Sequence, residues 1–382
     1  MKIVVAPDKF RGSLEADEVC KAMKEGILGA FPDAEVLSVP LADGGEGTAK
    51  ALTLQAKGEF ITIPVFDPLG RPIDATYGLS PDHSTAFIEM ASASGLWLLD
   101  LDERDPTQTT SYGTGQLIAD ALRRGVKKII LGIGGSATND AGIGMAAALG
   151  YRFLNSTGQE LPPNGENLIN IHSIDCANAN PCLDYAKITV ACDVTNPLYG
   201  HEGASYVYAP QKGATMEKIQ LLDKGLFILA KIATKTFGFD VSQEPGSGAA
   251  GGVGAGARWF LNATLQPGAS IVLTQTRIED YIKEADLVIT GEGKMDKQTL
   301  QGKLVKGLAE ICQKYEVPVA AVCGTLAISS EDIKKVGLSF AMSAINRPMS
   351  LEQAQKETFP LVREATFQLV SLFFHHKKMI KE

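Results

Sequence analysis

The chain has 382 residues, of which 45% are hydrophobic and 21% are charged, and its formal net charge at pH 7 is −8. This composition is typical of a folded globular protein, and the acidic balance argues against general binding to nucleic acid or to an anionic membrane. The length predicts two domains. We expect a cytoplasmic protein, because no apolar run approaches the ~18 residues of a membrane span and the first residues do not resemble a secretory signal.

Cysteine and histidine are placed in ways that argue against a soft metal site. The six cysteines form no Cys-x-x-Cys pair, and of the five histidines only His375 and His376 are close in sequence. Zinc sites usually need such pairs. A hard cation held by carboxylates stays open.

The chain begins with a predicted strand at residues 2–7, a short loop and a helix through residues 19–28. The loop carries Asp8, Lys9, Arg11 and Ser13. Because open α/β sheets bind ligands at the carboxyl ends of their strands, Lys9 and Arg11 are candidate contacts to an anion. Ser13 is the expected N-cap of the helix.

A second strand is expected at residues 35–41, followed by a glycine-rich loop with Asp43 and Glu46. Their carboxylates suit Mg²⁺ binding or acceptance of a hydroxyl proton. The alternative is a structural one, in which Asp43 closes a turn and Glu46 favours a helix N-terminus.

The pattern changes near residue 60. Short alternating segments at residues 60–66, 73–79 and 85–90 predict antiparallel strands and the start of a second domain. A polar segment at residues 105–115 then precedes a helix at residues 116–124. This segment either closes over a ligand or is a plain loop.

Residues 131–144 form the most informative stretch, LGIGGSATNDAGIG, between a buried parallel strand and a helix expected at residues 145–149. Its glycines expose backbone amides, and helix N-termini bind anions, so a phosphate or carboxylate is the expected ligand. The candidate residues are Gly134, Gly135, Ser136, Thr138 and Asn139. A tight structural turn is one alternative. A dinucleotide loop is another, weakened because no carboxylate that could hold a ribose appears before Glu160.

Further strands are expected at residues 188–192, 286–290 and 317–322. Asp193 and Asn196 follow the first of these, and Glu292, Lys294 and Asp296 follow the second. Between the strands at residues 188–192 and 286–290, residues 245–257 are glycine- and alanine-rich, which indicates a helix packed closely on backbone rather than a linker. The predicted fold is α/β. Residues 1–60 and 280–382 form a discontinuous Rossmann-like domain with a parallel sheet, and residues 61–279 form an inserted mixed α/β domain that carries the central glycine loop.

Five strand ends therefore carry glycine or carboxylate chemistry: Asp8, Asp43, the loop at Gly132, Asp193 and Glu292. Carboxylates grouped with anion-binding loops and lysines suit Mg²⁺-dependent phosphoryl transfer, in which the catalyst positions groups and neutralises charge. Neither a Walker A motif nor the protein-kinase motifs occur.

Seven segments together resemble the bacterial glycerate kinase family, type 1. They are APDKFRGSL (6–14), PLADGGEGT (40–48), GIGGSATNDAGIGMAAALG (132–150), ACDVTNPLYGHEGAS (191–205), PQKGA (210–214), GAAGGVGAGA (248–257) and LVITGEGKMDKQTLQGK (287–303). The resemblance implies a glycerate 2-kinase, which phosphorylates D-glycerate with ATP and Mg²⁺ in a cleft between two α/β domains and gives 2-phosphoglycerate. Three positions depart from the expected pattern: Arg11 for a lysine, Ala141 for a glycine and Lys294 for an arginine. Arginine and lysine are not equivalent donors.

Within this hypothesis Lys9 or Arg11 holds the substrate carboxylate, and the central loop holds either nucleotide phosphates or that carboxylate. Asp193 is the preferred general base, with Asp43 and Asp296 as rivals. The remaining candidates are Asp8, Ser13 and Asn196 for the substrate, Glu292 and Lys294 for ATP, and Asp43 and Glu46 for the metal.

Three other functions stay open. They are the same kinase giving 3-phosphoglycerate, an NAD-linked hydroxy-acid oxidoreductase and a non-catalytic sensor of small acids. The expected partners are glycerate and ATP, without nucleic acid or membrane, and a homo-oligomer is left open.

Overall fold

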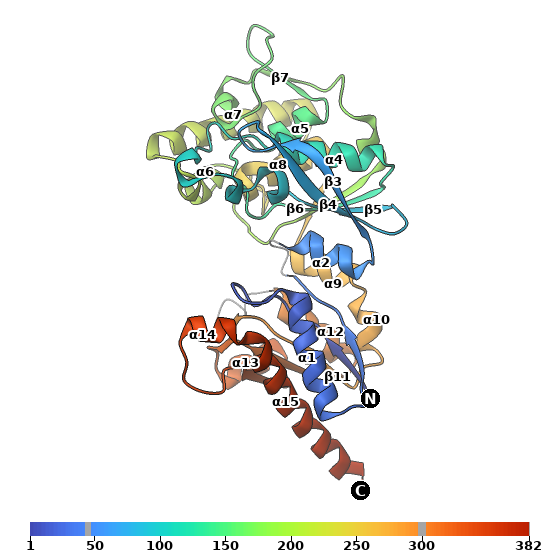
Figure 1. The fold of residues 1–382 in the computed structure, drawn as a ribbon. Helices are drawn as coiled ribbons and strands as arrows, with labels where there is room; N and C mark the ends of the chain where they lie inside the picture. The colour runs from blue at the N-terminus through green and yellow to red at the C-terminus, as the bar shows by residue number, and fades with distance from the viewer. Residues whose placement is uncertain (43–46, 297–302, 382) are drawn as a thin grey trace. The chain divides into compact units, whose positions relative to one another are not determined.

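The computed structural model describes residues 1–42, 47–296 and 303–381 (Figure 1). Its backbone contacts divide the chain into two units. The discontinuous unit consists of Met1–Asp43 and Ala269–Glu382, and the continuous unit consists of Gly44–Gly268. The boundaries expected near residues 60 and 280 stay a prediction about which segments fold independently. In the structure, helix α2 (Thr48–Gln55) packs on strands of the continuous unit.

The discontinuous unit is built on a parallel sheet of five strands. Their order is β15 (Phe340–Ser343), β13 (Val319–Cys323), β11 (Leu287–Thr290), β1 (Lys2–Val5) and β2 (Glu35–Ser38). Counted within this unit the order is 2-1-3-4-5, one of the two common orders of doubly wound α/β folds. Every residue of β11 and β13 is buried, as expected for strands covered on both faces. The predicted Rossmann-like parallel sheet is therefore confirmed.

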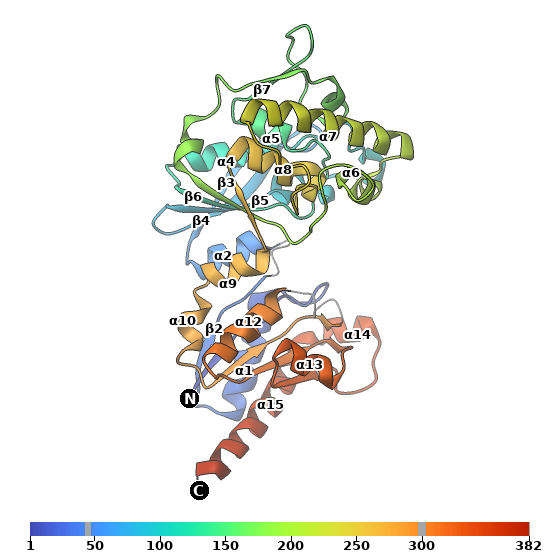
Figure 2. The same ribbon diagram turned by 180° about the vertical axis from the view of Figure 1, so that it is seen from behind.

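Helices cover this sheet. Helices α1 (Ala16–Ala30) and α15 (Thr358–Lys381) pack against each other and share one apolar core with alternate residues of the strands, including Ile3, Val5, Leu287 and Ile289. Helix α12 (Lys303–Lys314) and helix α13 (Ser330–Val336) are in contact with each other, and Figure 2 shows them from the side opposite to α1. The smaller elements are α9 (Gly268–Gln275), α10 (Ile278–Ile282), β12 (Lys294–Met295), β14 (Thr325–Leu326) and α14 (Leu351–Lys356).

Several helix boundaries differ from the predictions: α4 (Tyr112–Arg123) begins at Tyr112 rather than at residue 116, and α5 (Ile143–Ala148) begins at Ile143 rather than at residue 145. The N-cap of α1 differs as well. Helix α1 begins at Ala16 and its N-cap is Glu15, which forms a reciprocal capping box with Glu18. The expected N-cap Ser13 lies two residues earlier, and its hydroxyl donates instead to the carbonyl of Gln355 at 3.0 Å. The prediction was wrong because a tertiary contact with Gln355 of α14 takes this hydroxyl.

The continuous unit contains a mixed sheet of six strands. Their order is β10 (Thr264–Gln266), β9 (Lys187–Ala191), β6 (Lys128–Gly132), β5 (Thr85–Glu89), β4 (Pro72–Leu79) and β3 (Glu59–Phe66). Strands β3, β4 and β5 pair antiparallel, and β5, β6, β9 and β10 pair parallel. The predicted antiparallel segments and the predicted buried parallel strand before the glycine loop are both confirmed.

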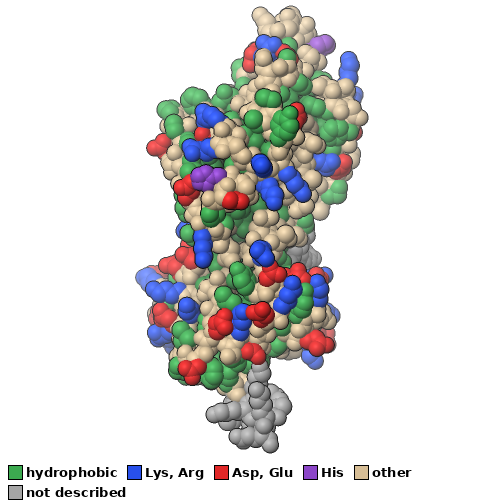
Figure 3. All heavy atoms as spheres, turned by 90° about the vertical axis from the view of Figure 1, so that its right-hand side faces the viewer, with side chains coloured by type: hydrophobic (Ala, Val, Ile, Leu, Met, Phe, Trp, Pro, Cys, Tyr) green, Lys and Arg blue, Asp and Glu red, His purple; other side chains and the backbone are tan. Residues whose placement is uncertain are grey.

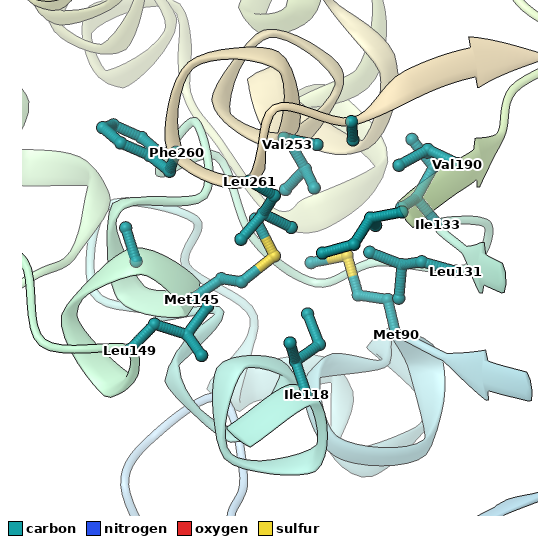
Figure 4. Packing of buried hydrophobic residues seen from close by; sticks show 14 of the residues in the cluster. Met90, Ile118, Leu131, Ile133, Met145, Leu149, Val190, Val253, Phe260 and Leu261 are labelled. Atoms are coloured by element: carbon teal, nitrogen blue, oxygen red, sulfur yellow. The ribbon is translucent and has the colours of Figure 1, made fainter. Parts of the chain in front are cut away.

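The main core of this unit lies between the sheet and helices α4 (Tyr112–Arg123), α5 (Ile143–Ala148), α7 (Met216–Phe237) and α8 (Ala249–Leu261). Figure 4 shows Ile118, Met145 and Leu261 pointing toward Leu131 and Val190 of the sheet. Helix α2 packs on the opposite face, because a Cβ on Gly78 of β4 would lie 1.6 Å from the Thr53 hydroxyl. The smaller elements are α3 (Ala91–Ser94), β7 (Arg152–Leu154), β8 (Ser173–Asp175) and α6 (Ala204–Tyr208).

Charged side chains of both signs lie on the surface. On the face drawn in Figure 3, basic and acidic side chains are interspersed. No helix in the described part of the chain combines the length and the apolar character that a membrane span requires.

Candidate functional site

In the discontinuous unit, the strand order reverses between β1 and β11, which is where doubly wound sheets bind ligands. The loops after these two strands lie side by side. The Asp8 amide donates to the carbonyl of Gly291 at 2.8 Å. A Cβ on Gly293 would lie 3.3 Å from the backbone of Phe10 and Arg11. The fold therefore brings together two segments that are almost 300 residues apart in the chain, and both carry predicted site residues.

These residues are not equally available to a ligand. Lys294 and Asp296 form an ion pair of 2.8 Å. The Ser13 hydroxyl contacts Gln355 and the hydroxyl of Thr358, so it ties this loop to α15. Asp8 accepts a hydrogen bond from the amide of Lys9 at 2.7 Å. Arg11 is exposed and Glu292 is half-buried. All of them stay predictions as ligand contacts.

The predicted metal candidates Asp43 and Glu46 lie outside the described residues. Within the described ranges, no group of three or more histidine, cysteine, aspartate or glutamate side chains is arranged to hold a metal ion. Asp43 and Glu46 therefore stay a prediction.

In the continuous unit, the central glycine loop follows β6 but does not present a helix N-terminus to a ligand. Helix α5 begins at Ile143, and its first amides are already occupied by a carboxylate of the same chain. Asp140 accepts hydrogen bonds from the amides of Gly142 at 3.1 Å and Gly144 at 3.2 Å. The expected anion site at this helix terminus is therefore wrong, because Asp140 fills it.

Asp140 also fixes a distant segment. Its carboxylate accepts hydrogen bonds from the amide of Ser111 at 2.8 Å and from the hydroxyl of Ser111 at 2.7 Å. Asp140 is fully buried, and this burial raises the pKa of its carboxyl group, although the four donors oppose the rise. Sequence reasoning passed over Asp140, because it follows directly on the polar residues assigned to the ligand.

The part of the loop that faces solvent lies earlier. Gly134 and Gly135 are exposed, and Gly135 has a φ of +71°, which favours glycine. Among the described residues, no hydrogen bond engages the amides of Gly134 and Gly135. The flanking backbone is fixed, since Leu96 donates to the carbonyl of Gly135 and Ala137 donates to the carbonyl of Ser94. These two amides are the donors that the loop can offer to an anion.

The amine of a buried lysine is hydrogen-bonded to residues that follow these two glycines. The amine of Lys212 donates to the hydroxyl of Ser136 at 2.9 Å and to the carbonyl of Thr138 at 2.6 Å, and the residue is 2% exposed. Burial lowers the pKa of Lys212 to about 7, and the charge of Asp140 partly offsets this shift. Sequence reasoning noticed the segment PQKGA but gave its lysine no role. The signal available in the sequence was a lysine that directly precedes a glycine and lies two residues after a proline.

The glycine-rich segment at residues 245–257 supports the loop from another side. It forms helix α8, in which residues Ala250, Gly251 and Gly252 have left-handed backbone angles. A Cβ on Gly251 would lie 2.1 Å from the Thr138 carbonyl oxygen, and one on Gly256 would lie 2.0 Å from that of Ala141. The prediction of a helix packed closely on backbone is confirmed, and the linker alternative is wrong.

The polar segment at residues 105–115 packs against the glycine loop. Thr109 and Ser111 are fully buried. The Thr109 hydroxyl donates to the carbonyl of Ala137 at 3.0 Å, and Asp105 pairs with Lys218 of α7 at 2.8 Å. These contacts support the glycine loop, and closure of the segment over a ligand stays a prediction.

The predicted residues after β9 are also anchored. Asp193 is exposed, and its carboxylate accepts a hydrogen bond from the amide of Gly268 at 3.2 Å. The side chain of Asn196 donates to the carbonyl of Glu202 at 2.8 Å and accepts from the Tyr208 hydroxyl at 2.6 Å. Asn139 is buried and donates to the hydroxyl of Ser205 at 3.1 Å. Asn139 and Asn196 therefore hold loops in place, and their contact with a ligand stays a prediction.

The dinucleotide alternative has no structural support. A dinucleotide-binding unit needs a parallel strand directly after the loop and helix. Here the next strand, β7, pairs antiparallel with β8 in a separate two-stranded sheet. The strand that pairs with β6 on the side away from β5 is β9, and this strand begins only at Lys187.

The fold and the strand-end loops define an α/β protein with one parallel sheet, one mixed sheet and an exposed glycine loop whose amides could bind an anion. The chain belongs to the glycerate kinase family, whose sequence profile matches residues 3–374. It is 43% identical to the glycerate 2-kinase of Escherichia coli K12 over 96% of both chains, and 45% identical to the glycerate kinase of Halalkalibacterium halodurans over 95% of this chain and 96% of that one. A crystal structure from Salmonella typhimurium LT2, described as a candidate glycerate kinase 2, superposes with a TM-score of 0.92 at 44% identity and covers 99% of both chains. The predicted family is confirmed.

The contact of α8 with the loop gives a first prediction. Gly251→Ala places a methyl group 2.1 Å from the Thr138 carbonyl, so we expect a loss of more than about 2 kcal/mol of unfolding free energy and a raised KM. Gly238→Ala is the matched control, because Gly238 also has a left-handed φ but no neighbour within 4 Å, and about 1 kcal/mol is expected there. Urea unfolding and steady-state kinetics check both. Equal losses in the two variants would contradict the close approach.

Lys212 gives a pH prediction. Between about pH 7 and its ordinary pKa of 10.5, Lys212 is neutral when folded and protonated when unfolded. The unfolded state then binds more protons, so the unfolding free energy gains a term that rises with pH by up to about 1.4 kcal/mol per pH unit. In Lys212→Met this term is absent. Urea unfolding at several pH values between 7.5 and 9.5 measures both slopes, and parallel curves would contradict the assignment.

Proposed function

We propose that this protein phosphorylates D-glycerate with ATP and gives 2-phosphoglycerate. The observation that carries the proposal is the full-length match to the glycerate kinase family, with the Escherichia coli relative named glycerate 2-kinase. In the reaction a glycerate hydroxyl oxygen forms a bond to the γ-phosphorus, the bond to the ADP oxygen breaks, and the hydroxyl proton passes to a base.

The glycine loop supports the binding of an anionic group. The exposed amides of Gly134 and Gly135 offer N–H donors to an anion in a chain of net charge −8, and the amine of Lys212 is hydrogen-bonded to the next residue, Ser136. This fits either the phosphates of ATP or the carboxylate of glycerate, and both assignments are kept. Ser136 is 7% exposed, whereas Thr138 and Asn139 are fully buried, so these last two act by holding the loop.

The loops after β1 and β11 are the second proposed contact region. Asp8, Lys9, Arg11 and Ser13 are proposed contacts to glycerate, and Glu292 and Lys294 are proposed contacts to ATP. The support for these residues is their position at the reversal of strand order. Asn196, which follows β9 in the continuous unit, is a further proposed contact to glycerate. Ser13 is the weaker member of the set, because its hydroxyl already contacts Gln355 and Thr358.

Mg²⁺ is the proposed metal, with Asp43 and Glu46 as its ligands. When bound, Mg²⁺ would neutralise charge on the transferring phosphate. Oxygen ligands of this kind suit Mg²⁺. The cytoplasmic location and the homo-oligomer stay predictions.

Asp193 is the proposed general base. It follows β9, a direct neighbour of the strand that carries the glycine loop, and its carboxylate is exposed. Asp296 is the weaker rival, because its carboxylate already pairs with Lys294. Asp43 is the other rival.

The proposed reaction is tested by incubating the protein with ATP, Mg²⁺ and D-glycerate and following the products by ³¹P NMR. We expect 2-phosphoglycerate and ADP. The 3-isomer would keep the kinase and overturn the choice of hydroxyl. Folded protein that leaves ATP and glycerate unchanged would overturn the kinase, and binding assays with NAD and with small hydroxy acids would then test the two remaining alternatives.

Asp193→Asn tests the base. Asparagine keeps an acceptor for the amide of Gly268 but cannot take a proton, so kcat is expected to fall about 10²- to 10⁴-fold with little change in either KM. Asp82→Asn is the control, because Asp82 also accepts a backbone amide but lies before β5, at the opposite end of the strands. An Asp193→Asn enzyme with normal kcat would exclude Asp193 as the base.

A further inference from the structure

We propose that Lys212 is a positioning residue for catalysis. Through its hydrogen bonds to Ser136 and Thr138, it fixes the glycine loop and directs the Ser136 O–H group toward the anionic group of the bound substrate. This inference rests on the proposed function in one respect, namely that the loop binds an anionic part of ATP or of glycerate.

The burial of Lys212 needs an explanation. A lysine amine is costly to bury unless it is paired or hydrogen-bonded. Both hydrogen bonds of this amine go to the glycine loop, at 2.9 Å and 2.6 Å. Within the part of the chain whose side chains are described, Lys212 forms no ion pair with a carboxylate, and Asp140 acts on its charge only through space. The donors of this amine are therefore spent on the glycine loop rather than on a carboxylate of the chain.

The turn that carries Lys212 is itself rigid. Gly213 has a φ of +91°, and a Cβ on it would lie 2.0 Å from the carbonyl oxygen of Arg104. The same turn begins with Pro210 and ends at Lys212. The amine thus comes from a fixed backbone, although lysine side chains are usually mobile.

The hydrogen bond to Ser136 has a chemical consequence. A hydroxyl oxygen that accepts a bond from an amine keeps its own proton for a different partner. Ser136 follows the two exposed glycines directly, and it is 7% exposed. An anion bound at the amides of Gly134 and Gly135 is the partner that this O–H group would meet, and a hydrogen bond to a charged acceptor is stronger than one between neutral groups.

The hydrogen bond to Thr138 fixes the loop itself. The Thr138 carbonyl is held by Lys212 on one side and approached closely by Gly251 on another. Asp140 then anchors the next residues to Ser111. The loop is therefore rigid before a ligand binds, which lowers the cost of binding.

A double-mutant cycle tests this coupling. Ser136→Ala, Lys212→Met and the double variant are compared for kcat, for the KM of each substrate, and for the Kd of ATP and of D-glycerate by calorimetry. We expect Ser136→Ala to weaken binding of one substrate about tenfold, which is the size of one hydrogen bond to a charged group, and Lys212→Met to weaken the same substrate at least as much. The double variant should be no worse than Lys212→Met, because Lys212 acts through Ser136.

Tyr77→Phe is the control for removal of a buried polar group. Tyr77 is 1% exposed in the same unit, and its hydroxyl donates to Asp120 at 2.8 Å. We expect a lower Tm without a change in any KM or Kd. If Lys212→Met behaves like Tyr77→Phe, Lys212 has only a structural role and the proposal is overturned.

Two further outcomes separate this inference from the proposed function. If wild-type protein makes phosphoglycerate but Ser136→Ala keeps both Kd values, the kinase stands and the inference fails, even if Lys212→Met does not fold. If wild-type protein has no kinase activity, the calorimetric Kd values still decide: weaker anion binding in Ser136→Ala and Lys212→Met supports the inference, and unchanged values overturn it. Should Lys212→Met be unfolded, Lys212→Arg takes its place in the cycle.

Discussion

The carboxylate of Asp140 is the group on which the glycine loop depends. It accepts four hydrogen bonds, two from the start of α5 and two from Ser111, which lies 29 residues earlier in the chain. The backbone amides at the start of α5, which would otherwise attract an anion, are thus hydrogen-bonded to a carboxylate of the same chain. The same carboxylate holds the first turn of α5 against Ser111, at the start of α4. The donors that we propose for ligand binding therefore lie earlier in the loop, at Gly134 and Gly135, whose backbone is exposed.

In both units, polar loops are brought together for the same physical reason. In parallel sheets the carboxyl ends of neighbouring strands lie at one edge, so the loops after them are brought together whatever their distance in sequence. In the discontinuous unit this joins the loop after β1 to the loop after β11, and in the continuous unit it places the segment after β9 beside the loop after β6.

The strands could be predicted from the sequence because apolar runs such as those of β6, β11 and β13 have few other stable environments. The positions of the strand ends, and hence most candidate residues, followed from them. Lys212 and Asp140 could not be assigned, because their roles depend on partners that are distant in sequence: the turn at Gly213 must rest on Arg104 before the lysine is buried, and Asp140 must meet Ser111. Ser13 was misassigned for the same reason, since Gln355 of α14 and Thr358 of α15 supply its partners.

Ala141 shows how a departure from the family pattern is accommodated. The pattern leads one to expect glycine there, and the backbone explains why, since Ala141 has a φ of +50°. The methyl group fits because the facing residue is Gly252, on which a Cβ would lie only 3.0 Å from that of Ala141. A hydrogen bond of 3.0 Å from the Ala141 amide to the carbonyl of Gly251 holds the strained residue in place. Contacts with α8 thus hold Ala141 in its left-handed conformation, and the same helix approaches the Thr138 carbonyl of the glycine loop.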